Sequence, residues 1–458
     1  MAHASREGLP PGPNTPALFV TLGYMKDAYK YYRTQYQKFG SPFTVRTLRG
    51  PLVIVTDPEQ AKQVFTQNPD ELDVWGADAL DPIVGPTSLL LVAGNRHKRD
   101  RKLLTPPFHG ARMKAYGAVM REAARREVAR FRVGEEKSFL PSAQAISLEV
   151  ILRAVFGVQT SSDVEAWSRA VTALMESAHP AGLFFRAARI APFGLGPWAK
   201  FLAARAAVDK MIYNEIHDRR TSERYGEDIL SLMLQARYED GGVMSDADLR
   251  DELMTLLLAG HETTAISLSW ALYWLHRHPS ELADLRRELD QLTDDGRFEA
   301  EHIAQLPLLE AVCNETLRLH PIVVDVIRHV RAPIEIGGYK LPAGSNVAVS
   351  IATIHERDDV FERAAEFAPK RFLRKKFSPF EHMPFGGGHR RCLGAAFAMY
   401  EMKLVLAELL RDHTFEVVGS ERVARRGITL GPAGGVRVRY LGPRVAKPSE
   451  RPSSANAS

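Results

Sequence analysis

A single long apolar stretch, residues 245–278, most limits how this chain can fold. Ser245 is a favourable N-cap residue and Pro279 ends the pattern, so the stretch predicts a helix of about 33 residues, roughly 50 Å long. Its middle is apolar on nearly every face of the helix. Because such a helix is stable only when other elements surround it, we expect a mainly α protein with this helix through its centre.

The remainder of the chain predicts further helices and a small β-sheet region. Its 458 residues are 45% hydrophobic, which is enough for a large core, and we find no internal repeat and no linker between halves. We therefore expect one catalytic domain over residues 1–442 and a disordered tail, rich in Pro, Ser and Ala, over 443–458. Strand-like segments occur at 43–46, 52–55, 334–336, 347–349 and 436–438.

The cysteine content and the N-terminus indicate where the protein is found. Only Cys313 and Cys392 occur, so no disulfide framework is implied and a reducing compartment is expected. No run of about 18 apolar residues is present, and the first residues lack the order of a signal peptide. We expect a soluble, cytoplasmic monomer without a membrane anchor.

The ten residues Phe385–Gly394 read Phe-Gly-Gly-Gly-His-Arg-Arg-Cys-Leu-Gly. Three successive glycines, beginning at Gly386, let the backbone approach a flat ligand, and Arg390 supplies a fixed cation. A thiolate beneath a macrocycle is stabilised by backbone N–H groups and a following helix N-terminus. Cys392 is therefore a candidate axial ligand of a haem iron. The alternative is a Gly-rich turn that contains an unrelated buried cysteine.

Polar residues interrupt the long apolar helix at Ala259–Thr264, which reads Ala-Gly-His-Glu-Thr-Thr. Such a conflict with the surrounding pattern usually marks function. Gly260 would allow the helix to open, and a Thr hydroxyl can bond a carbonyl one turn back, so together they predict a groove for a small ligand. Glu262 as acid and Thr263 as alcohol could relay protons into that groove. The alternative is a polar cluster satisfied within the core.

Together these two segments resemble the cytochrome P-450 family of haem-thiolate monooxygenases. The resemblance implies the family's fold, haem b with Cys392 as the axial thiolate, and a soluble, bacterial-type member. It also identifies Glu262 and Thr263 as the family's acid–alcohol pair. The family signature F-x-x-G-x-R-x-C-x-G is matched by Phe385, Gly388, Arg390, Cys392 and Gly394.

The resemblance also assigns a structural role to a charge network. Glu315 and Arg318 are three residues apart on a predicted helix, a spacing that by itself is common in surface ion pairs. In the family such a pair is completed by the Arg of a P-E-R-F segment, represented here by Arg371, with Lys370 in place of the usual Glu. This buried network is expected to hold the cysteine loop in place.

Haem propionates need cations, and the resemblance supplies candidates from several parts of the chain. His97 and Arg101 lie one helical turn apart, and Arg328 and Arg390 occupy positions where relatives bind a propionate. His355 is a further candidate. For any one of these residues, the alternative is an ordinary basic side chain at the surface.

The expected reaction is insertion of one oxygen atom from dioxygen into a lipophilic terpenoid, steroid, fatty acid or polyketide. Electrons would come from NAD(P)H through a separate redox partner. Residues 179–198 predict either a mobile apolar lid or a simple connector. Family geometry suggests a substrate pocket formed by residues 74–91, 257–263, 323–327 and 428–430.

A net charge of +5 favours an acidic partner. If the resemblance holds, the basic segments 96–102, 370–376 and 390–391 lie on the thiolate side of the haem, where an acidic ferredoxin or flavodoxin would dock. The alternative is a solvated basic surface. No nucleic-acid-binding motif accompanies these charges.

Two other functions remain open at this point. The nearer is a haem-thiolate enzyme that uses peroxide or acts without dioxygen, although such relatives usually lack the acid–alcohol pair. The more distant is a non-catalytic haem or lipid-binding protein. Turnover with a ferredoxin, its reductase and NAD(P)H would separate the latter from an oxygenase.

Overall fold

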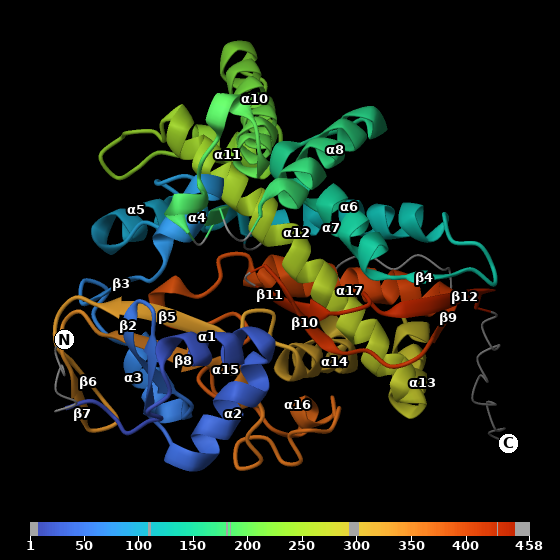
Figure 1. The fold of residues 1–458 in the computed structure, drawn as a ribbon. Coiled ribbons are helices and arrows are strands. Elements are labelled where there is room, and N and C mark those ends of the chain that lie inside the picture. The colour runs from blue at the N-terminus through green and yellow to red at the C-terminus, as the bar shows by residue number, and fades with distance from the viewer. Residues whose placement is uncertain are drawn as a thin grey trace, which may run out of the picture.

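The computed structural model describes residues 8–108, 111–179, 182–183, 185–292, 302–427 and 429–444. Helices make up most of the molecule, and the strands form small sheets (Figure 1). The α-helices are α1 (Ala17–Lys26), α2 (Ala28–Phe39), α3 (Pro58–Phe65), α4 (Ala77–Val84), α5 (Gly94–Leu104), α6 (Ala111–Val128), α7 (Leu140–Phe156), α8 (Ser161–Ser177), α10 (Pro197–Ser222), α11 (Ile229–Gln235), α12 (Asp246–Arg277), α13 (Pro279–Asp290), α14 (Pro307–Leu319), α15 (Ile351–His355), α16 (Arg371–Arg374) and α17 (Ala395–Asp412).

The predicted long helix is confirmed as α12, which crosses the middle of the molecule (Figure 1). It begins after Ser245, whose hydroxyl oxygen accepts a hydrogen bond from the backbone N–H of Asp248 at 3.1 Å. Its neighbours include α7, α10, α14 and α17. Most of its residues are buried, as its apolar composition requires.

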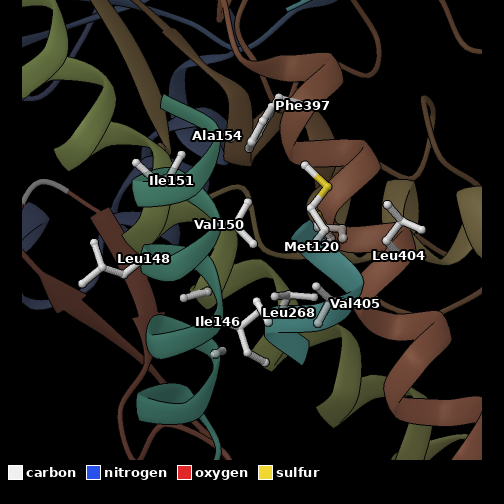
Figure 2. Close-up of a cluster of buried hydrophobic side chains, with 14 of the residues drawn as sticks. Met120, Ile146, Leu148, Val150, Ile151, Ala154, Leu268, Phe397, Leu404 and Val405 are labelled. Carbon is white, nitrogen blue, oxygen red and sulfur yellow. The ribbon is translucent and has the colours of Figure 1, made fainter. Parts of the chain in front are cut away.

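Helices α6, α7 and α17 meet α12 in the core. Figure 2 shows Ile146 and Val150 of α7 packed near Met120 of α6, Leu268 of α12 and Val405 of α17. All five side chains are buried. Burying a large aliphatic side chain contributes about 1.5–3 kcal/mol, so this packing fixes the position of α12.

A five-stranded sheet lies apart from the helical core, with strand order β1-β2-β8-β5-β3 (Figure 1). It contains the strands predicted at 43–46, 52–55 and 347–349. Strand β5 alternates between two faces, with Val326 in one apolar cluster and Ile327 in another, beneath α1 and α2. The strands of this sheet are β1 (Phe43–Thr47), β2 (Gly50–Val55), β3 (Leu72–Val74), β5 (Asp325–Val330) and β8 (Asn346–Ser350).

Three smaller sheets complete the fold, and they include the strands predicted at 334–336 and 436–438. The last strand ends at Pro443, where the predicted C-terminal tail begins, and Arg444 then pairs with Asp290 at 2.6 Å. The remainder of that predicted tail, 445–458, lies outside the described residues. The strands are β4 (Glu136–Ser138), β6 (Ile334–Ile336), β7 (Tyr339–Leu341), β9 (His413–Val417), β10 (Val423–Arg426), β11 (Thr429–Pro432) and β12 (Arg437–Pro443).

The three expected members of the charge network are in contact. Arg318 donates two hydrogen bonds to the carboxylate of Glu315, at 2.7 and 2.9 Å, and both side chains are fully buried. Arg371 donates to the same carboxylate at 3.1 Å, and so does the backbone N–H of Ala368, at 2.8 Å. The second arm of the Arg318 guanidinium reaches the carbonyl of His355 at 2.8 Å. The network therefore joins α14 to α15 and to the segment before α16.

Replacing Arg318 with Ala should destabilise the protein by about 3–5 kcal/mol, because Glu315 would lose its main partner while remaining buried. Urea denaturation measures this change. Arg130→Ala is the matched control, since Arg130 pairs with Glu127 at the same three-residue spacing but is 70% exposed. Equal losses in the two variants would contradict a buried network.

A second buried carboxylate, Glu401 of α17, lacks such a partner. Neither of its carboxylate oxygens accepts a hydrogen bond from any described residue. Burial raises the pKa of Glu401 from about 4.5 to about 8. The folded protein therefore holds a proton on Glu401 at pH values where the unfolded chain has released it.

Stability should consequently fall as the pH rises from about 5 to 8, because the unfolded state binds fewer protons over that range. Glu401→Gln is neutral at every pH, so its melting temperature should rise relative to that of the unsubstituted protein between pH 5 and pH 8. Glu335→Gln, which changes an exposed residue of β6, should show no such trend. A pH-independent difference for Glu401→Gln would refute the assignment.

Candidate functional site

The cysteine loop, Phe385–Gly394, lies directly before α17. The backbone N–H of Cys392 donates to the carbonyl of Phe385 at 3.0 Å, which closes the loop. Gly388 has a φ of +66°, and a Cβ there would lie 2.1 Å from the carbonyl oxygen of Phe65, the last residue of α3. A Cβ on Gly387 would lie 2.5 Å from the ring of Phe65. These two glycines therefore allow contact with α3, whereas the sequence suggested contact with a ligand.

Cys392 is an exposed residue, yet the protein around its thiol raises the pKa of that thiol. Burial is the main cause of the increase, and a hydrogen bond from the backbone N–H of Gly394 opposes it, as do the charges of Arg391 and Arg101. The thiol is thus accessible to a bound group while protein surrounds it. The groups that oppose the increase are those that stabilise a thiolate.

The polar motif of α12 is accessible although the helix around it is buried. Ala259 is exposed and Thr263, one turn later on the same face, is partly exposed. The hydroxyl of Thr263 donates to the carbonyl of Ala259 at 2.8 Å, and that of Thr264 donates to the carbonyl of Gly260 at 3.0 Å. This face of α12 therefore presents a hydroxyl and backbone to any group bound against it.

The expected opening of α12 at Gly260 is not observed, because α12 is continuous through the motif. A Cβ on Gly260 would lie 2.6 Å from the Cδ1 of Ile151 in α7. The absence of a side chain therefore permits close packing of α12 against α7.

Glu262 is held by two residues that the sequence did not identify. Its Oε1 accepts a hydrogen bond from the Nε of Arg426, in β10, at 3.0 Å. Its Oε2 accepts one from the amide of Gln144 in α7. These partners are 164 and 118 residues away along the chain, so no local pattern could have revealed them. The acid of the predicted pair is fixed beside Thr263 by strand β10 and helix α7.

Five basic side chains gather beside the cysteine loop. Burial, together with the charges of Arg390, His389, Arg101 and Arg328, lowers the pKa of His97 to about 3. All five therefore lie within electrostatic range of one another, and we call them the cation group. His389 was not predicted, although its position between Gly and Arg in the cysteine loop was a usable signal.

The arginines of the cation group form no ion pair with any described residue. Arg101 donates to a carbonyl of the cysteine loop at 2.6 Å, and Arg390 donates to the carbonyl of Val92 at 2.8 Å. Burial lowers the pKa of Arg328 to about 10, and the charge of Arg390 contributes. Asp73 is near Arg390 but not in contact with it. Unpaired cations that are partly removed from water are costly, so this group is suited to an anionic ligand.

His355 does not join the cation group, contrary to the sequence expectation. Its Nδ1 is 3.2 Å from the carbonyl oxygen of Arg318, and its Nε2 accepts a hydrogen bond from the backbone N–H of Met383 at 3.1 Å. With both ring nitrogens occupied, the imidazole has no donor for a propionate. It instead links the charge network to the residues just before the cysteine loop.

These residues fit a haem. Cys392 offers one accessible thiol, the cation group offers charge for carboxylates, and Ala259 with Thr263 offers a narrow polar face. Among the described residues, no group of three or more His, Cys, Asp and Glu side chains could hold a metal ion. A macrocycle with a single protein ligand would be compatible with that composition.

Several of the predicted basic segments are engaged in ion pairs. In segment 96–102 Arg96 pairs with Asp248, and in segment 370–376 Lys370 pairs with Glu281 at 3.0 Å. Within the described part of the chain, the basic residues of these segments that are exposed and form no ion pair are Lys98, Arg374, Lys376 and Arg391.

The predicted substrate-lining residues are described in part. Val323 is 39% exposed and leads into β5, while Ile428 lies outside the described residues. In the predicted lid, Phe193 is fully exposed, and Phe184 lies outside the described residues. The alternatives of lid and connector both remain predictions.

No single helix of the described chain is long and apolar enough to cross a membrane. Helices α7 and α8 satisfy those criteria only as a pair, and they are bent by 110° relative to each other.

Changing Gly388 to Ala should cost about 1–3 kcal/mol, since the substitution places a side chain at positive φ and against the backbone of Phe65. Gly394→Ala is the matched control in the same loop, because a Cβ there has no neighbour within 4 Å. Urea denaturation and the haem content of the purified variants test the comparison. Similar losses for both would mean that contact with α3 does not explain the glycine.

Comparisons with known proteins place these features in context. The family model for cytochrome P450 matches residues 10–431. Cytochrome P450 138 of Mycobacterium tuberculosis is 37% identical over 437 residues, which cover 94% of this chain and 96% of that protein. Cytochrome P450 135B1 of the same organism is 32% identical over 463 residues, covering 100% and 96%.

A solved structure shares the fold. The retinoic acid-bound cyanobacterial CYP120A1 superposes with a TM-score of 0.81 at 25% sequence identity. The match covers 94% of this chain and 99% of that one.

Proposed function

This chain belongs to the cytochrome P450 family, a family of haem monooxygenases, and from that premise we propose that the thiolate of Cys392 would hold the haem iron and that the substrate is a lipophilic small molecule. When bound, the haem supplies activation of dioxygen and transfer of one oxygen atom to the substrate. The observation that carries the proposal is the accessible Cys392 thiol beside five basic side chains without acidic partners.

The cation group would hold the propionates of haem b. Arg101, Arg328 and Arg390 remain charged at neutral pH and form no ion pair within the described residues. His97 is neutral, since burial lowers its pKa to about 3, and it would act as a hydrogen-bond donor. Neutralising these partly buried arginines with carboxylates reduces the cost of leaving them unpaired.

Glu262 and Thr263 would control proton delivery at the face of α12 that presents Ala259 and Thr263. In the structure the Thr263 hydroxyl donates to the carbonyl of Ala259, and Arg426 holds the Glu262 carboxylate. An ordered water between the hydroxyl and the carboxylate would pass protons along α12. Arg426 is then a positioning residue, because it fixes the acid without touching the reacting atoms.

The substrate is best described by the chemistry of the lining residues. Val323, Val326 and Ile327 are apolar and at least partly exposed. The related structure CYP120A1 carries retinoic acid, a lipophilic isoprenoid. A terpenoid, steroid, fatty acid or polyketide is accordingly the proposed class.

Electrons would come from NAD(P)H through a separate acidic ferredoxin or flavodoxin. Four exposed cations, Lys98, Arg374, Lys376 and Arg391, are free to meet such a partner. Arg391 directly precedes Cys392, so a partner bound there would be close to the thiolate. Complementary charge mainly increases the rate of association, and that rate should fall as salt increases.

The first experiment is the spectrum of the reduced, carbon monoxide-bound protein, whose Soret band is strongly red-shifted only when the opposite ligand is thiolate. We expect a red-shifted band that Cys392→Ser abolishes. Cys313→Ala changes the second cysteine, which is fully buried in α14, and should keep the shift. An unshifted band in the unsubstituted protein would refute the proposal.

Thr263→Ala should increase peroxide release per NAD(P)H consumed and decrease product, because the relay would lose its hydroxyl. Product and peroxide are measured together with a surrogate ferredoxin and reductase. Thr264→Ala is the control, since the hydroxyl of Thr264 bonds the carbonyl of Gly260 elsewhere on the helix. An unchanged ratio of product to peroxide in Thr263→Ala would favour the peroxide-using alternative.

A further inference from the structure

A buried carboxylate lies at the start of strand β5, beside residues expected to line the substrate pocket. Asp325 accepts a hydrogen bond from the hydroxyl of Tyr24, in α1, at 2.9 Å. Tyr32 of α2 lies beside Tyr24, and the ring centroids of these two tyrosines are 5.3 Å apart. Burial raises the pKa of Asp325, while the two tyrosines and Arg425 oppose the increase. Nevertheless, the side chain is still partly exposed.

A basic side chain faces this carboxylate without meeting it. The guanidinium of Arg425, in β10, lies 4.9 Å from the centroid of the Tyr24 ring and donates to the Tyr24 carbonyl at 3.4 Å. Its Nε is buried and has no hydrogen-bond partner among the described residues. No ion pair joins Arg425 to Asp325 in the described chain. Tyr24 thus separates an acceptor, Asp325, from a donor, Arg425.

The surroundings of this pair are apolar. Ile327, two residues along β5, faces the same side as Asp325 and belongs to the cluster beneath α1 and α2. Val324 and Leu430 pack together with Tyr24 in a separate cluster. A lipophilic molecule that reached Asp325 would therefore meet apolar side chains beside the two charges.

The pair also lies close to the proposed proton relay. Arg425 and Arg426 are adjacent in β10, with Cα atoms about 3.8 Å apart, and side chains of successive strand residues point in opposite directions. Arg426 binds Glu262 of α12. Strand β10 therefore contacts Tyr24, the hydrogen-bond partner of Asp325, through Arg425, and contacts the polar motif of α12 through Arg426.

We propose that Asp325, Tyr24 and Arg425 form a polar subsite that selects lipophilic substrates ending in a hydroxyl group over those ending in a carboxylate. The proposal rests on the proposed function and deepens it. A hydroxyl can donate to Asp325 and accept from Arg425, whereas a carboxylate would be repelled by Asp325 at close range. Asp325 is a specificity residue and takes no part in the chemistry.

The test compares alcohols with acids of the same chain, farnesol with farnesoic acid and dodecanol with dodecanoic acid. Dissociation constants are measured from the ligand-induced shift of the Soret band in the haem-loaded protein. We expect each alcohol to bind at least about tenfold more tightly than its acid, as for a hydrogen bond to a charged group. Tighter binding of an acid than of its alcohol, or no binding of either alcohol, would overturn the proposal. This part of the test needs no variant.

Asp325→Asn should remove the preference, because an amide does not repel a carboxylate. The affinity for each acid should increase about tenfold, the reverse of what general damage to the site would cause. Arg425→Gln should lower the affinity for the acids below that of the unsubstituted protein, since Arg425 is the nearest cation. Glu335→Gln, at an exposed position of β6, is the matched control and should leave the affinities for alcohol and acid unchanged.

The carbon monoxide spectrum of each variant separates this proposal from the assignment of the haem ligand. A red-shifted band in Asp325→Asn, together with an unchanged preference, would mean that Asp325 only anchors α1 through Tyr24, and would overturn the subsite. Loss of the red shift in the unsubstituted protein would instead refute the haem-thiolate assignment.

Discussion

The burial of α12 is the constraint on which the rest of the structure depends. A helix of 32 residues that is apolar on most faces needs partners on every side, and α7, α10, α14 and α17 provide them. Once α12 is enclosed, any polar group on it must be satisfied or accessible. Thr264 is satisfied by the helix backbone, Glu262 is satisfied by Arg426 and Gln144, and Ala259 is exposed in the middle of the helix. The polar motif is therefore compatible with an otherwise apolar core.

Charge is distributed in two opposite ways around the cysteine loop. The Glu315–Arg318 pair is fully buried and closed on itself, with each carboxylate oxygen and most guanidinium donors engaged. The cation group is its reverse, with several basic side chains and no acidic partner among the described residues. Because an unpaired buried cation is destabilising, the first arrangement serves the fold and the second is suited to a ligand. His355 belongs to the first arrangement, which explains why it is not available to the second.

Strand β10 connects two regions with different roles. Arg425 lies over Tyr24 and close to Asp325, and Arg426 binds Glu262. The alternation of a strand allows adjacent arginines to serve opposite sides. The hairpin of β10 and β11 packs against α12, so displacement of one arginine would be transmitted to the other through a short, hydrogen-bonded element. Recognition of the substrate's polar end and control of proton delivery would then share one element.

The sequence by itself determined the mainly helical fold, the limits of α12, several short strands, and the identity of the motif residues, because these depend on local periodicity, capping and spacing. The family was recognisable for the same reason. The sequence did not determine that Gly387 and Gly388 pack on Phe65, that Gly260 packs on Ile151, or that His355 bonds Met383. Nor did it determine that Arg426 binds Glu262 or that Tyr24 donates to Asp325. Each of these is a contact between residues far apart in the chain. Only the tertiary structure decided them, since the free energy of such a contact depends on which elements the packed core brings together, and no local pattern encodes that.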